Sequence, residues 1–262
     1  MISPDLHSLG FDYPEWGDLV SAMCERPLKT VIDAGPFAAV SIYQDESGAA
    51  VSIFRYQDYP PYTSPSLQGT RGYHVKAYQI YPSLALLDIY EDGDIEDPTY
   101  RLLAVVDDPH RYPIYEFGKE GVIVEYDDYR LSAVAFDVQV YPNEDEWKKN
   151  QTPIDMSDSP DPDLPDEMYI GPKFVTSPCL FALYSGDAKP EEAGANAVFK
   201  GVVEKAELKT NHLTGQQWWC CEVDCGFPII AALPGDIEPA PAAGSVIDGD
   251  VFILGSSGFW DN

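Results

Sequence analysis

Apolar and polar residues alternate over short stretches through most of the chain, which predicts antiparallel strands. Phe37–Gln44 and Ala49–Tyr56 flank Asp45-Glu46-Ser47-Gly48, a combination typical of a β-hairpin. The same alternation predicts further strands at Tyr73–Ile80, Leu84–Tyr90, Tyr100–Val106, Ile114–Phe117, Val122–Tyr126 and Leu131–Tyr141. In the last of these we expect the core face to consist of Ser132, Val134, Phe136, Val138 and Val140. Strands do not alternate with helices, so this is not the pattern of a nucleotide-binding parallel sheet.

Two helices are predicted from capping signals. Asp12 followed by Glu15 is typical of a helix start, and Pro27 ends the apolar spacing that follows. Asn143 with Glu146 predicts a second, short capped helix. The fold class is therefore α+β and mainly antiparallel β.

The last third of the chain shows the clearest series of strands. Strands are predicted at Val198–Lys209, Gln216–Asp224, Phe227–Leu233 and Ser245–Leu254, with a bulge at Gly201. On the second of these strands, Trp219, Cys221, Val223 and Cys225 share one face, which we expect to face the core.

This order of elements resembles the small Greek-key barrel called the OB-fold. The resemblance covers about a quarter of the chain and rests on element order without a sequence motif. Four strands are visible where an OB-fold has five, and Pro234–Gly244 is too rich in proline for the usual helix. A generic open antiparallel sheet is the alternative.

Gln151–Glu167 is dominated by Asp, Pro and Ser and predicts an exposed linker. We therefore expect an N-terminal α+β domain at 1–170, a connecting segment at 171–194 and a C-terminal β module at 195–262. Phe174–Tyr184, within the connection, is apolar enough to predict a strand.

Asp and Glu number 44 against 16 Lys and Arg, a formal net charge of −28. Such a chain should be repelled by nucleic acid and by anionic membranes, because both bind proteins through cations. The acidity fits either solubility, including a salt-adapted proteome, or a surface that binds a basic partner. We expect a cytoplasmic protein, because the five cysteines are an odd number and Met1–Gly10 lacks the features of a signal peptide.

Two groups of residues invite a metal interpretation. Cys220, Cys221 and Cys225 lie near His212, but adjacent strand residues point to opposite faces, so core thiols are the better interpretation. Asp92, Asp94 and Glu96 lie in an acidic loop and are calcium candidates, although such a loop is more often only solvated. No cofactor is predicted, since no phosphate-binding glycine loop is present.

Two functions remain open. The first is a non-enzymatic interaction protein, similar in general character to bacterial immunity proteins and inhibitors, that engages a basic partner. The second is an acidic hydrolase or a carbohydrate-binding protein that uses carboxylates and exposed aromatic residues. A pocket that gathers two buried carboxylates beside Trp or Tyr would favour the second, and a broad acidic face would favour the first.

Overall fold

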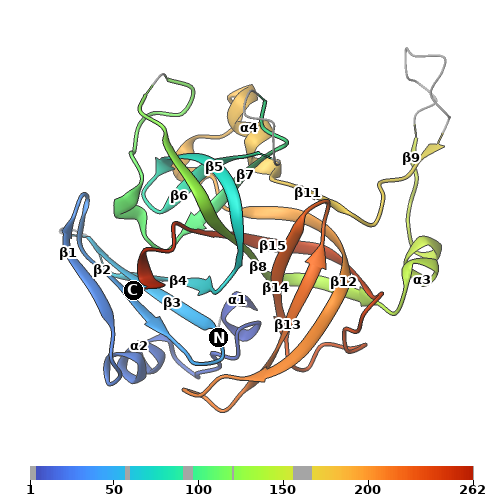
Figure 1. Ribbon diagram of the computed structural model, residues 1–262, viewed down its shortest axis with the longest axis horizontal. Coiled ribbons are helices and arrows are strands. Elements are labelled where there is room, and N and C mark those ends of the chain that lie inside the picture. Colours follow the sequence, from blue (N-terminus) through green and yellow to red (C-terminus); the bar gives the residue numbers. More distant parts are fainter. Residues whose placement is uncertain (1–3, 57–59, 91–96, 120, 156–166, 262) are drawn as a thin grey trace.

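The computed structural model describes residues 4–56, 60–90, 97–119, 121–155 and 167–261 (Figure 1). Strands far outnumber helices, and most strand pairs are antiparallel. The expected β-rich class is therefore confirmed.

Two helices and a four-stranded sheet form the N-terminal layer. The helices are α1 (Pro4–His7) and α2 (Trp16–Cys24). The antiparallel strands follow one another in sequence order: β1 (Lys29–Ala34), β2 (Phe37–Gln44), β3 (Ala49–Tyr56) and β4 (Tyr62–Leu67). The predicted hairpin on either side of Asp45–Gly48 is thereby confirmed.

A nine-stranded sheet makes up the rest of the fold, in the order β11-β12-β13-β14-β8-β15-β7-β6-β5. Its strands are β5 (Thr70–Tyr81), β6 (Leu84–Tyr90), β7 (Tyr100–Val106), β8 (Val124–Tyr141), β11 (Phe174–Thr176), β12 (Asn196–Thr210), β13 (Gln217–Asp224), β14 (Pro228–Pro234) and β15 (Val246–Ser256). The remaining elements are η1 (Pro109–Arg111), α3 (Glu144–Lys149), β9 (Ile154–Asp155) paired with β10 (Glu167–Met168), α4 (Pro178–Ser185), η2 (Pro190–Glu192) and η3 (Phe259–Asp261).

The nine-stranded sheet closes on itself twice. β12, β13, β14, β8 and β15 pair in that order, and β15 pairs again with β12. β5, β6, β7, β15 and β8 form a second ring, closed by the pairing of β8 with β5. The long strands β8 and β15 belong to both rings and lie side by side at the centre of Figure 1. Residues on both sides of position 170 therefore share one sheet.

One continuous core fills both rings. It includes Leu87 of β6, Phe199 of β12 and Ile253 of β15, all almost fully buried. A second cluster packs the N-terminal layer against the outer face of the β12–β14 ring and includes Leu19 of α2 and Trp218 of β13. Burial of each such side chain contributes about 1.5–3 kcal/mol, so the layer is held mainly by apolar packing.

The four strands predicted in the last third agree with β12 to β15 within two residues at each end. Cys221, Val223 and Cys225 face the main core, as expected, and Trp219 packs against it. The predicted bulge at Gly201 is wrong, because the register of β12 against β13 shifts between Val203 and Lys205. Gly201 instead leaves room for Val223, which a Cβ at this position would strike.

The predicted core face of β8 is only partly correct. Val138 and Val140 face the main core, but Leu131 and Ala133 do so as well, while Val134 faces the second cluster. β8 is covered on both sides, so alternation does not identify its inner face. The register shift between Asp250 and Val251 of the neighbouring β15 also changes the phase along the strand.

Two predictions about strands and turns are wrong. The separate strands predicted at Val122–Tyr126 and Leu131–Tyr141 are one strand, because β8 continues through Asp127 and Asp128, which lie beside His74 and Arg71 of β5. The Asp127 carboxylate lies 2.8 Å from His74 Nδ1. Most of the strand predicted at Phe174–Tyr184 is the helix α4, which has Pro178 in its first turn and Gly186 at its left-handed cap.

The start of α2 also differs from the prediction. Its N-cap is Glu15, not Asp12, and the Asp12 carboxylate instead lies 2.9 Å from His7 Nδ1. The second predicted cap is confirmed, since Asn143 Oδ1 accepts a 2.9 Å hydrogen bond from the Glu146 backbone N–H.

Candidate functional site

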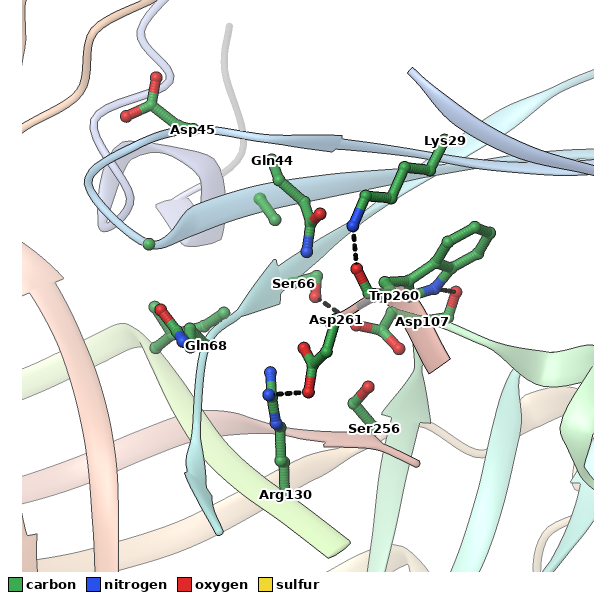
Figure 2. A pocket seen from close by; sticks show the side chains of 13 residues that line it. Lys29, Gln44, Asp45, Ser66, Gln68, Asp107, Arg130, Ser256, Trp260 and Asp261 are labelled. Atoms are coloured by element: carbon green, nitrogen blue, oxygen red, sulfur yellow. Dashed lines mark hydrogen bonds and ion pairs between the residues drawn. The ribbon is translucent and has the colours of Figure 1, made fainter. Parts of the chain in front are cut away.

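A polar pocket of about 250 Å³ lies where the N-terminal sheet, β8, β15 and η3 meet (Figure 2). Its polar and aromatic lining residues come from several elements that are far apart in sequence: Lys29, Gln44, Asp45, Ser66, Gln68, Asp107, Arg130, Ser256, Trp260 and Asp261. Two of these, Asp107 and Asp261, place carboxyl groups in the pocket, so it is the kind of concavity that the hydrolase hypothesis requires.

The Asp261 carboxylate of η3 is held by two guanidinium groups. Arg71 of β5 and Arg130 of β8 both donate to its Oδ2 atom. The Arg130 side chain is only 8% exposed, and burial lowers its pKa, as does the neighbouring charge of Arg71. Asp261 thus supplies a counter-charge for a buried cation and is not free to act as a base.

Asp107, directly after β7, is the carboxyl group most changed by its surroundings. Burial raises its pKa to about 8, and the adjacent Asp108 adds to the rise. Ser66 Oγ donates a 2.7 Å hydrogen bond to Oδ2, which opposes the rise. The Oδ1 atom is buried and has no hydrogen-bond partner among the described residues. Burial and the charge of Asp108 thus favour the protonated form of Asp107.

Asp45 contributes its backbone to the pocket while its carboxylate points away (Figure 2). That carboxylate accepts hydrogen bonds from the backbone N–H groups of Ser47 at 2.9 Å, His212 at 3.0 Å and Leu213 at 3.2 Å. Burial favours its neutral form, but the hydrogen bonds outweigh burial and lower the pKa of Asp45. Its role is to join the β2–β3 turn to the β12–β13 loop.

Trp260 forms one wall of the pocket but offers no free ring face. Its side chain is 3% exposed and packs with Phe54 and other residues of the N-terminal sheet. Its indole N–H donates to the Asp107 carbonyl at 3.0 Å, and its own carbonyl accepts from Lys29 Nζ. Stacking of a sugar ring on this tryptophan is therefore blocked by the protein itself.

A second region of interest is the exposed surface of α2, its two capping residues and β1, and it is acidic and partly apolar. Glu15, Asp18, Glu25 and Asp33 are exposed, and none has an ion-pair partner within the described ranges. Trp16 and Ile32, 46% and 69% exposed, lie among them in the sequence. β1 is also the end strand of its sheet, so one edge of its backbone is unpaired there. We call this surface the α2–β1 face.

The residues singled out for metal binding do not come together as a site. The calcium candidates Asp92, Asp94 and Glu96 lie outside the described residues. Cys221 and Cys225 are buried in the main core, where burial raises both pKa values to about 12, as expected for core thiols. In the part of the chain that the structure describes, no group of three or more His, Cys, Asp or Glu is arranged to hold a metal ion.

The pocket residues Asp107, Arg130 and Asp261 were not recognised from the sequence. Each is a common residue at the end of a strand or in a short turn, and their sequence positions give no spacing typical of a site. One sequence feature could have indicated the pocket: Asp107 and Asp108 directly follow an apolar strand. Polar residues in the loops at strand ends often belong to functional sites.

Comparisons of the chain with protein-family models, with curated proteins and with solved structures find no match. Among the described helices, none has the length and apolar character needed to cross a membrane. Function is therefore inferred from the residues of this chain alone.

Proposed function

We propose that this chain is a non-enzymatic interaction protein, of the immunity or inhibitor type, that binds a basic partner through the α2–β1 face. The observation that carries the proposal is the set of four exposed carboxylates on and next to α2 and β1 that have no ion-pair partner among the described residues, together with the exposed Trp16 and Ile32 of the same two elements. Protein interfaces commonly combine an exposed aromatic or aliphatic anchor with a polar rim. A cationic partner would meet both on this face.

The distribution of cations supports the same proposal. Counting only carboxylates in the part of the chain that the structure describes, nine of the 16 Lys and Arg residues form ion pairs within the chain. These pairs leave a large excess of acidic side chains, whose field attracts cations over a distance of about 10 Å at moderate salt. Association with a basic partner should therefore be fast and sensitive to salt.

The unpaired edge of β1 supplies a geometric reason for the choice of face. An extended segment of a partner can add to such an edge through backbone hydrogen bonds. Ile32, exposed on β1, would then contact an apolar side chain of the added strand, and Asp33 a basic one. The proposed partner is accordingly a protein with a basic, extended segment.

Capture at low ionic strength tests the proposal. The full chain is immobilised and exposed to a cell extract, and bound proteins are eluted with increasing salt. We expect a basic protein that elutes at moderate salt, because its attachment is electrostatic. Recovery of no cationic protein would remove the proposal.

The second candidate is the acidic hydrolase or carbohydrate-binding protein, and Asp107 is the observation that favours it. A protonated carboxyl group in a pocket is the feature expected of a general acid. The second carboxylate is less suitable, because two arginines hold Asp261. The thermal unfolding temperature of the full chain, measured with and without each of a set of oligosaccharides, tests this candidate. If no oligosaccharide raises that temperature, the candidate is excluded.

We also propose that the C-terminal module is an OB-like barrel, with β8 as its fifth strand. The support is the strand order, in which β14 pairs in parallel with β8 and β15 pairs with both β8 and β12. The module then still begins at residue 195 in the sequence, but its fifth strand, β8, belongs to the segment before residue 170. A cytoplasmic location stays part of the proposal, since all five cysteines are free thiols.

A further inference from the structure

Two buried polar atoms in the pocket lack partners. Arg130 Nε and Asp107 Oδ1 have no hydrogen-bond partner within the described part of the chain, and both residues are more than nine-tenths buried. An unpaired buried polar group is unfavourable because it has lost its water without gaining a partner, so such groups usually have an acceptor or donor in the working protein. Arg130 Nε–H is a donor. A protonated Asp107 presents a second donor, its O–H.

The pocket also gathers cations, which are few in this acidic chain. Lys29 and Arg130 line it, and Arg71 reaches Asp261 from its edge. These are three of only 16 Lys and Arg residues in a chain of net charge −28. All three converge on the C-terminal residues, where Lys29 binds the Trp260 carbonyl and both arginines bind the Asp261 carboxylate. Three cationic groups thus surround the Asp261 carboxylate and the Trp260 carbonyl at one side of the pocket.

We propose that this pocket binds a small carboxylate-bearing molecule. Its carboxylate accepts a hydrogen bond from the unpaired Nε–H of Arg130 and forms a second hydrogen bond with the unpaired Oδ1 atom of Asp107. It competes with the Asp261 carboxylate for the two arginines. The proposal does not rest on the α2–β1 face: the two share only β1, whose Lys29 lines the pocket, while the exposed residues of that face are other ones.

The geometry favours a carboxylate over other ligands. Arg presents Nε–H and Nη–H in a planar fork that matches the two oxygens of one carboxylate. Asp261 uses only Nη2 of Arg130 and leaves Nε unused. The volume of about 250 Å³ admits a small molecule, and the exposed Gln44 and Gln68 at its rim provide amides for polar groups of that molecule.

Succinate is a suitable probe, because it is small and carries carboxylates at both ends. Calorimetric titration of the full chain with succinate at neutral pH should show saturable binding, and the neutral analogue succinamide should show none. Inorganic phosphate is titrated in parallel. Binding of phosphate in place of succinate, or equal binding of succinate and succinamide, overturns the assignment to a carboxylate.

Three variants place the binding in the pocket. Arg130→Gln should weaken succinate binding by a factor of about ten or more, since it removes the charge and the fork. Asp261→Asn should strengthen it several-fold, because the internal competitor is neutralised while the arginines remain. Arg101→Gln, which removes an arginine from the distant ion pair with Asp88, serves as the matched control and should leave binding unchanged.

The thermal transition of each variant is recorded first. If Arg130→Gln does not fold, Arg130→Lys keeps the positive charge without the planar fork and should still weaken binding. Succinate binding that is unchanged in Arg130→Lys and Asp261→Asn overturns the proposal, as does the absence of binding to the wild type and to Asp261→Asn.

Discussion

Arg130 and Asp261 lie 131 positions apart in the sequence, and their side chains form an ion pair in the polar pocket. Arg130 is on β8, the strand shared by both rings, and Asp261 is on the short helix η3 at the C-terminal end of the described chain. The pair therefore fastens η3 to the centre of the fold and holds Trp260 against the N-terminal sheet.

Arg130→Gln should lower the free energy of unfolding by about 2 kcal/mol, between the values typical of exposed and of buried ion pairs. Arg101→Gln should cost less than about 1 kcal/mol, because the Arg101 side chain is 43% exposed. Urea unfolding of both variants measures the difference. Equal losses would contradict the role given to the Arg130–Asp261 pair.

Asp45→Ala should destabilise the protein by about 2–4 kcal/mol, because three backbone N–H groups lose their acceptor and the two turns that Asp45 joins are released. The neighbouring Glu46 is exposed and has no such contacts among the described residues, so Glu46→Ala should change stability by no more than about 0.5 kcal/mol. Thermal unfolding checks both. A small effect of Asp45→Ala would mean that the turns are held by packing alone.

Asp107 should give stability a distinctive dependence on pH. Its pKa is about 8 in the folded protein and about 4 in an unfolded chain. Between these two pH values the folded state binds a proton that the unfolded state has released. The contribution of Asp107 to the free energy of unfolding is therefore present at low pH and falls as pH rises toward 8. The slope is at most about 1.4 kcal/mol per pH unit.

The variant Asp107→Asn removes this titration, and groups outside the Asp107–Asp108 pair titrate in both proteins, so the difference reports on the pair. The free energy of unfolding of the wild type, relative to Asp107→Asn, should fall steadily from about pH 5 to about pH 8. Urea unfolding at several pH values gives this difference. A constant difference across the window would show that Asp107 is ionised in the folded protein.

The shared strand β8 predicts how fragments behave. Residues 195–262 expressed alone lack β8 and leave the edges of β14 and β15 unpaired, so we expect no cooperative thermal transition. The same segment with residues 124–141 joined to its C-terminus should regain one. A sharp transition in 195–262 alone would show that the module folds without β8.

Local features of the fold were predictable from the sequence, and distant pairings were not. β12 to β15 are separated by clear turns, and the Asn143 cap depends on a residue only three positions away. β8 was harder, because both of its faces are buried and its charged end stays in the sheet through partners on β5. Alternation within one strand carries no information about either condition.

The pocket was not predictable for a related reason. Asp107, Arg130 and Asp261 meet only because β7, β8 and η3 come together in three dimensions, and each residue is ordinary in its own segment. Burial distinguishes Asp107 and Arg130 from the many other Asp and Arg residues of the chain, and burial becomes visible only once the layers are packed together. The acidity of the chain, in contrast, was visible in the composition, but the α2–β1 face required the fold to show which carboxylates lack partners.

The most direct test of the proposed interaction is the affinity of a captured basic partner for two matched variants. Glu15→Lys with Glu25→Lys alters the α2–β1 face, and Glu191→Lys with Glu238→Lys makes the same change in net charge at exposed positions elsewhere. At low salt the first pair should weaken binding about tenfold or more, and the second should have little effect. Equal weakening by both pairs would contradict the account, because binding would then depend on total charge and not on the α2–β1 face.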